Sequence, residues 1–91
     1  SDRLNKRIIS QFNAAERILS GISNRLKNFK SIEEINGYLS TDIMVEKVRD
    51  IISTLNTLGD NVKADEISSK LKKIKEESIT EFKDRQELCR W

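Results

Sequence analysis

Three kinds of side chain in this sequence could do chemistry: paired carboxylates, a cluster of lysines and one cysteine. The carboxylates form neighbouring pairs at three places: Glu33/Glu34, Asp65/Glu66 and Glu76/Glu77. Neighbouring residues on a helix point about 100° apart, whereas the two carboxylates of a catalytic pair must share one pocket. We therefore expect these side chains to lie in solvent rather than in an active site.

The lysines are densest between Lys70 and Lys75, where four of six residues are lysine. Such a cluster could contact phosphates or an anionic membrane surface. Glu76, Glu77 and Glu81 dilute its charge, and the few aromatic residues are too scattered to form a stacking platform for nucleic acid. The sequence favours a solvent-exposed face, and we expect neither nucleic acid nor a membrane as a partner.

Other catalytic or metal-binding chemistry has few residues to work with. The chain has no His, which excludes an imidazole-based triad and a zinc site that uses histidine. Its one cysteine, Cys89, cannot form an internal disulfide. Arg85 and Arg90 could activate the thiol, but packing or exposure near Trp91, the last residue, is the simpler role. We expect no catalytic, cofactor-binding or metal-binding residues, and no enzymatic activity.

Length and charge are those of one small helical domain. The chain has 91 residues, of which 35 % are charged and 36 % apolar. No apolar run reaches the roughly 18–20 residues that span a bilayer. The net charge of +2 conceals an alternation, because residues 1–30 carry +5, residues 31–61 carry −4 and residues 62–91 carry +1. Alternating signs are expected where oppositely charged helices lie side by side.

Helices are the elements that must position these side chains. The chain has no Pro, and apolar residues recur at every third or fourth position in three stretches, which predicts helices over residues 2–29, 42–58 and 61–89. The first stripe consists of Leu4, Ile8, Phe12, Ala15, Leu19, Ile22, Leu26 and Phe29. The second consists of Met44, Val45, Val48, Ile51, Ile52, Leu55 and Leu58. The third consists of Ile67, Leu71, Ile74, Ser78 or Ile79, Phe82 and Cys89, and it weakens after Phe82.

Local signals set the boundaries of these helices. Ser31 and Glu34 have the spacing of a capping box, but Asn36-Gly37 follows as a stop signal, so we expect no more than a short turn there. The second helix should be capped by Ser40, Thr41 or Asp42 and the third by Asp60 or Asn61. Gly59 should end the second helix. Gly21 lies inside the first stripe, where we expect it to permit close packing.

These elements predict an all-α fold, a three-helix up-down-up bundle with a long first helix. We expect residues 1–91 to form a single helical domain that is a piece of a larger protein.

Three segments of the sequence resemble a known family, and one of them, Val45 to Leu58, looks like the lid helix that leads into a Gly/Asp turn. The first helix reads Gln11-Phe12-Asn13-Ala14-Ala15-Glu16, which resembles the Asn-x-x-Glu segment in the lid helix of the 70-kDa heat-shock chaperones and their 110- and 170-kDa relatives. Residues 62–74, which contain Lys70-Leu71, are similar to the closing segment of the same lid. Thr54-Leu55 and Ser78-Ile79 stand where the family often has Trp-Leu and Pro-Ile, which is typical of a divergent branch.

This resemblance implies a non-catalytic C-terminal lid. Such a lid closes over a bound unfolded peptide or supports nucleotide exchange on a partner chaperone. An ATPase domain and a peptide-binding β-sandwich would precede it, so ATP would bind only to the upstream domain. Unfolded polypeptide or a partner chaperone would be engaged through those upstream domains, in the cytoplasm or the endoplasmic reticulum.

A second resemblance implies a different role. Ile22-Ser23-Asn24-Arg25-Leu26 and Gly37-Tyr38-Leu39-Ser40 look like segments of the steroid receptor RNA activator domain, which is shared with a coat-protein C-terminus. This likeness implies a freestanding helical module for protein–protein interaction that holds a stable partner.

Overall fold

The fold is built entirely from helices. The computed structural model describes the backbone of residues 2–89 and the side chains of residues 2–84. Within these bounds the chain forms four helices and no strand: α1 (Asp2–Leu26), α2 (Ile32–Thr41), α3 (Ile43–Thr57) and α4 (Asn61–Cys89). The all-α class predicted from the apolar periodicity is thus confirmed.

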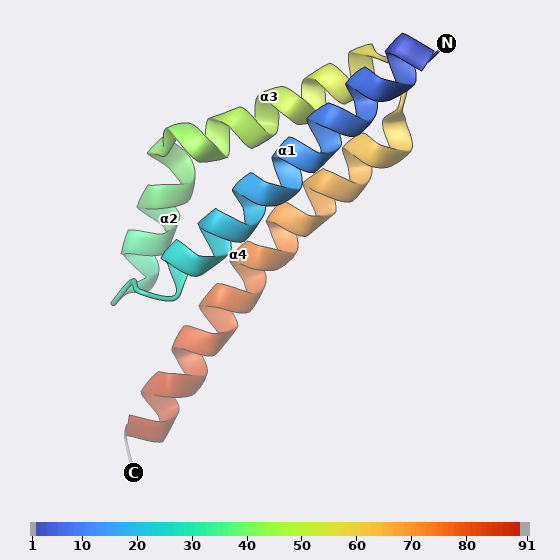
Figure 1. Cartoon of the computed structure of the whole chain (residues 1–91). Coiled ribbons are helices and arrows are strands. Elements are labelled where there is room, and N and C mark those ends of the chain that lie inside the picture. The colour runs from blue at the N-terminus through green and yellow to red at the C-terminus, as the bar shows by residue number, and fades with distance from the viewer. Residues whose placement is uncertain (1, 90–91) are drawn as a thin grey trace.

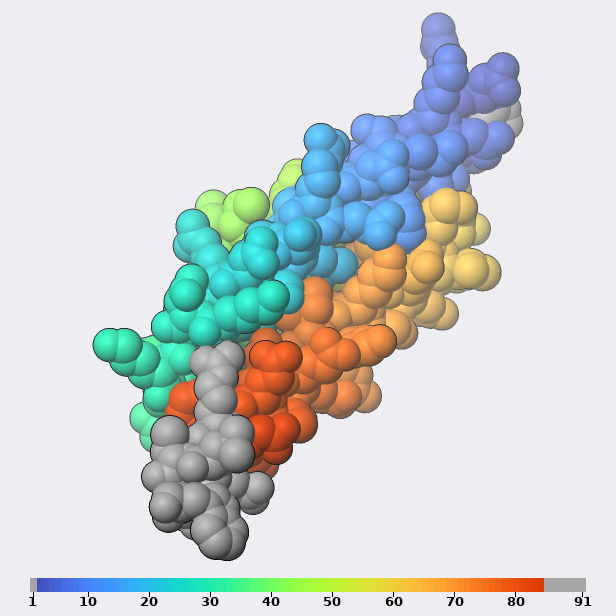
Figure 2. All heavy atoms as spheres, turned by 60° about the horizontal axis from the view of Figure 1, so that its bottom comes forward, coloured from blue at the N-terminus to red at the C-terminus, as the bar shows by residue number. Residues whose placement is uncertain are grey.

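The long helices give the molecule an elongated shape, with principal extents of 59 × 20 × 16 Å. In Figure 1, α1 and α4 run in the same direction along the long axis, and α3 runs back against both. Figure 2 shows α1, in blue to cyan, beside α4, in orange, along one face. The helix α2 is short and stands at an angle to α3, so the two form an elbow near one end of α1.

The structure has four helices where the sequence predicted three, because residues 32–41 form α2 rather than a short turn. Ser31 caps it as expected, accepting a hydrogen bond from the Glu34 backbone N–H at 3.1 Å. The helix then continues through Gly37, which the sequence reading wrongly took as a stop. Ile35 and Leu39 are both buried in the core, and burying two such side chains outweighs the cost of one helical glycine, about 1 kcal/mol.

A single residue, Asp42, separates α2 from α3. Its backbone N–H donates to the Tyr38 carbonyl at 2.9 Å, and its carboxylate accepts from the Met44 backbone N–H at 2.7 Å. Asp42 therefore ends α2 and caps α3. Of the three predicted caps, Ser40, Thr41 and Asp42, it is Asp42 that occupies the position. The break is also required by the apolar pattern. Leu39 and Val48 are both buried, yet in one continuous helix their spacing of about two and a half turns would put them on opposite faces.

The turn between α3 and α4 follows the prediction. Gly59 has a φ of 95°, a conformation that side chains with a Cβ adopt only with strain. The Asp60 N–H donates to the Leu55 carbonyl at 3.0 Å and the Gly59 N–H to the Asn56 carbonyl at 3.1 Å, the two bonds of a Schellman motif. The Asp60 carboxylate then caps α4 by accepting from the Lys63 backbone N–H.

The core is a continuous apolar cluster contributed by all four helices. Its buried members are Ile8, Ala15, Leu19, Ile22, Leu26, Ile35, Leu39, Val45, Val48, Ile51, Leu55, Ala64 and Ile67. Ala64 and the two residues of α2 were missed by the sequence reading. Leu4 and Met44, which it placed in the stripes, are exposed instead.

Two further expectations about α1 need correction. The helix ends at Leu26 rather than residue 29, and Phe29 packs from the following turn against the Tyr38 ring, with ring centroids 5.1 Å apart. Gly21 lies inside α1 as expected, but a Cβ there would meet nothing within 4 Å. Close packing is therefore not the reason for glycine at this position.

Candidate functional site

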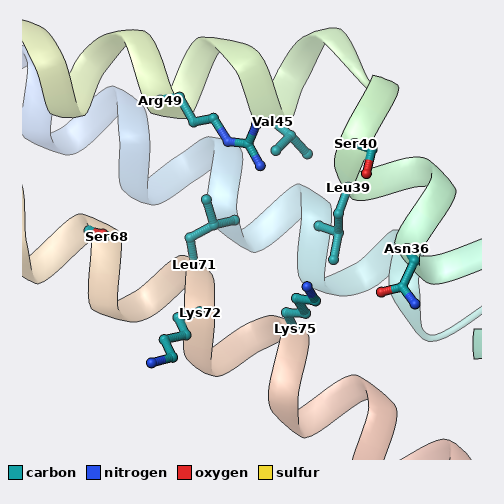
Figure 3. Close-up of a pocket in the computed structure, with 9 residues that line it drawn as sticks. All are labelled: Asn36, Leu39, Ser40, Val45, Arg49, Ser68, Leu71, Lys72 and Lys75. Carbon is teal, nitrogen blue, oxygen red and sulfur yellow. The ribbon is translucent and has the colours of Figure 1, made fainter.

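A groove of about 520 Å³ lies where the elbow of α2 and α3 faces α4 (Figure 3). We call it the elbow groove, and it is lined by Asn36, Leu39, Ser40, Val45, Arg49, Ser68, Leu71, Lys72 and Lys75. Its volume falls within the range of ligand sites in proteins, roughly 300–1,000 Å³. The groove exists because Asp42 redirects the chain, so that α2 forms one wall and α3 another.

The elbow groove has an apolar floor and a cationic rim. Leu39 and Val45 belong to the buried core, and Leu71 packs against it from α4. In Figure 3, Leu71 points from α4 toward α3 and Lys75 points toward Leu39. Three cations complete the lining, Arg49 from α3 and Lys72 and Lys75 from α4, and none of the carboxylates described in the structure lines the groove.

None of the rim cations is neutralised within the part of the chain whose side chains are described. The ion pairs there involve other lysines, Lys63, Lys70 and Lys73. Arg49, Lys72 and Lys75 are all exposed. Among the described side chains, the groove is thus lined by three cations that form no ion pair within 4 Å, and Leu71 is the partly exposed apolar residue of its floor.

The helix divides the predicted lysine cluster between two faces. Lys70 turns toward α1, where its Nζ lies 2.8 Å from the Glu16 Oε2 and 5.5 Å from the centroid of the Phe12 ring. The hydrogen bond to Glu16 raises the pKa of Lys70. Lys73 lies near Glu77, at 3.9 Å. The expectation of one solvent-exposed cluster therefore needs refinement, since two of its lysines contact carboxylates and the other two line the elbow groove.

The carboxylate-contacting face borders a second hollow of about 480 Å³ between α1 and α4. Lys27, Lys70 and Lys73 line it together with Glu16 and Glu77, and two of these three lysines, Lys70 and Lys73, face carboxylates of the same chain. It is close to the elbow groove in size, and it differs in that two carboxylates offset most of its positive charge.

A third hollow, of about 390 Å³, lies on the α1 side of the elbow, lined by Arg17, Ile18, Gly21, Ile22, Arg25, Tyr38 and Met44. The Tyr38 hydroxyl oxygen is buried without a hydrogen-bond partner. Burial, and then the nearby Asp42 carboxylate, raise the pKa of Tyr38. Ile43, which follows Asp42, is 75 % exposed. The hollow on the α1 side of the elbow therefore combines two arginines with apolar side chains.

The residues first considered for chemistry do not come together. All six members of the carboxylate pairs are exposed. Among the described residues there is no group of three side chains suited to hold a metal ion, and no helix has the length and hydropathy needed to cross a membrane. The side chains of Cys89 and Trp91 lie outside the described residues.

The sequence reading missed the groove because its rim comes from two helices. A signal was present on α4, since Ser68, Leu71, Lys72 and Lys75 follow helical spacing on one face, while Lys70 and Lys73 follow it on another. Nothing local indicated that Arg49 would join that face. No family model, curated protein or solved structure matches this chain.

Proposed function

We propose that this chain is a non-catalytic helical module that binds another protein, and that the elbow groove is its docking surface. The observation that carries the proposal is the groove itself, with its apolar floor and unpaired cationic rim. Protein interfaces combine these features, an apolar centre and a polar border.

The second resemblance supports this role. Gly37-Tyr38-Leu39-Ser40, one of the segments similar to the steroid receptor RNA activator domain, lies in α2 immediately before the elbow. Leu39 and Ser40 line the groove. The segment that suggested an interaction module therefore forms part of the proposed docking surface.

Site-specific photo-crosslinking in cells that express the protein tests the proposal. A photoreactive amino acid replacing Ser68, which lines the groove, should yield an adduct with one defined protein. The matched control replaces Ser69, an exposed neighbour of the same type that points about 100° away. Equal adducts from both positions, or none from position 68, would refute the proposal.

A chaperone lid is the second candidate, and one contact favours it. Glu16 of the Asn-x-x-Glu segment and Lys70 of Lys70-Leu71 are the family-like positions of α1 and α4, and they lie in contact at 2.8 Å. The antiparallel course of α3 relative to α1 and α4 in Figure 1 supports this candidate. As a lid, the domain would close over bound unfolded peptide or support nucleotide exchange on a partner chaperone.

The lid predicts a particular gene structure. The full coding sequence should contain an ATPase domain upstream of this region, and a sequence without one would exclude the lid. The two candidates also differ in what they capture, because a lid should yield many unfolded clients in the crosslinking experiment where an interaction module yields one protein.

A further inference from the structure

We propose that the occupant of the elbow groove is an acidic protein segment that also carries large apolar side chains. This inference rests on the proposed function, since it names the chemical class of the partner at the same surface. Three features carry it: the charge balance of the groove, the contrast with the neighbouring hollow, and the apolar floor.

The contrast between the two hollows shows where negative charge is lacking. Lys70 and Lys73 face the hollow between α1 and α4, where Glu16 and Glu77 lie within 4 Å of them. Lys72 and Lys75, on the other face of the same helix, have no carboxylate within 4 Å among the side chains of residues 2–84. Arg49, Lys72 and Lys75 carry like charge around one groove, although Figure 3 shows the Lys72 ammonium directed away from it. Like charges without a counter-charge repel one another. An acidic partner would relieve that repulsion and gain complementary pairing, so the missing carboxylates are those of the occupant.

The floor distinguishes a protein segment from a free anion. Leu71 is only partly buried and lies between the cations, above the buried Leu39 and Val45, and a small anion such as phosphate would leave the exposed part of Leu71 in contact with water. An acidic segment with Leu, Ile or Phe side chains would cover the base and pair with the rim in one binding event. Removing apolar area from water stabilises the complex in proportion to the area covered.

A random peptide library displayed on phage, selected against the purified 91-residue chain at low salt, tests the inference. We expect the enriched peptides to carry net negative charge and at least one large apolar residue. The Lys72→Glu/Lys75→Glu variant should bind them about ten-fold or more weakly, because two favourable charge pairs become repulsive. The matched control, Lys73→Glu/Lys83→Glu, changes the net charge equally on the same helix and should bind within about two-fold of the parent chain.

Salt and lipid complete the test. Binding of the enriched peptides should weaken as salt rises from about 0.05 to about 0.5 M, since exposed charge pairs are screened. Enrichment of neutral or basic peptides, or equal losses in the two double variants, would overturn the inference. Vesicles containing phosphatidylserine form a separate arm. If the parent chain binds these vesicles and only the Lys72→Glu/Lys75→Glu variant loses that binding, the groove is assigned to an anionic lipid surface. That result would also overturn the inference.

Different experimental results would reject the inference and the proposed function. A defined crosslinked partner with no dependence on Lys72 or Lys75 would keep the docking surface and reject its acidic occupant. Circular dichroism of both double variants checks that each keeps the helical content of the parent chain, so that a loss of binding is not a loss of fold.

Discussion

Replacing each glycine by alanine should change stability with a sign that depends on its place in the fold. Gly37 lies inside α2 and Gly21 inside α1, and a Cβ at either position would meet nothing within 4 Å. Neither has a positive φ. Alanine there keeps the helix and reduces the conformational freedom of the unfolded chain, which should stabilise each variant by about 0.4–1 kcal/mol.

Gly59 should respond in the opposite direction. Its φ of 95° is a conformation in which a Cβ meets the backbone, at a cost of about 1–2 kcal/mol. Gly59→Ala should therefore destabilise the chain although the surrounding space is empty. The three substitutions add the same methyl group, so they serve as controls for one another.

Urea titration followed by far-ultraviolet circular dichroism measures these changes, and thermal melting gives a second reading. For a domain of this size, 1 kcal/mol corresponds to a shift of roughly 4–8 °C in Tm. The dependence of unfolding free energy on urea should stay constant across the series. A Gly37→Ala variant no more stable than the parent would contradict a continuous α2 and would remove one wall of the elbow groove.

Three further predictions concern the core, the elbow and the last turn. Leu55 is fully buried and Leu71 only partly, so Leu55→Ala should lower the free energy of unfolding by about 2–5 kcal/mol and Leu71→Ala by clearly less; equal losses in urea titrations would contradict this packing. Asp42→Ala removes the acceptor that caps α3 and should cost about 0.5–2 kcal/mol, whereas Asp42→Asn keeps an acceptor and should recover most of that loss in the same assay. The hydrogen bonds from Lys63, first from its backbone and then from its side chain, lower the pKa of Asp60, so NMR titration should place it below the ordinary aspartate range. A lowered pKa in the folded state stabilises the protein above the unfolded pKa of about 4, and this contribution is lost as pH falls through the folded value; Asp60→Asn should flatten that part of the stability curve, and an unchanged curve would contradict the role of this cap.

The helices with one uninterrupted stripe were predictable from the sequence. The observed bounds of α4 equal the predicted range, and α1 ends three residues before its predicted end. Both helices were predictable because their apolar residues recur on one face without a competing local signal. The elbow was harder because local and tertiary preferences disagree there. Asn36-Gly37 favours the end of a helix. The helix continues because Ile35 and Leu39 are buried by tertiary packing, and a local sequence pattern contains no information on that packing.

The groove was less predictable than the helices because its composition depends on contacts between distant segments. The spacing of Lys72 and Lys75 is local and visible, but Arg49 joins them only because α3 packs against α4. The pairing of Lys70 with Glu16 joins residues 54 positions apart. Periodicity assigns a residue to a face of its own helix, and it does not say which charges of another helix will neutralise that face.

The wall of the elbow groove formed by α2 is the part of the fold that depends most on its neighbours. A helix of ten residues is marginal in isolation, so α2 persists through its Ser31 cap and the burial of Ile35 and Leu39. Leu39 links the core to the groove, since it belongs to the buried cluster and also lines the groove. A partner that docks against the α2 wall of the groove would bind only the state in which α2 is formed, and binding to that state alone stabilises it by mass action. Occupation of the groove should therefore protect the amide hydrogens of α2 from exchange more than those of the central turns of α1, which the core already holds in place.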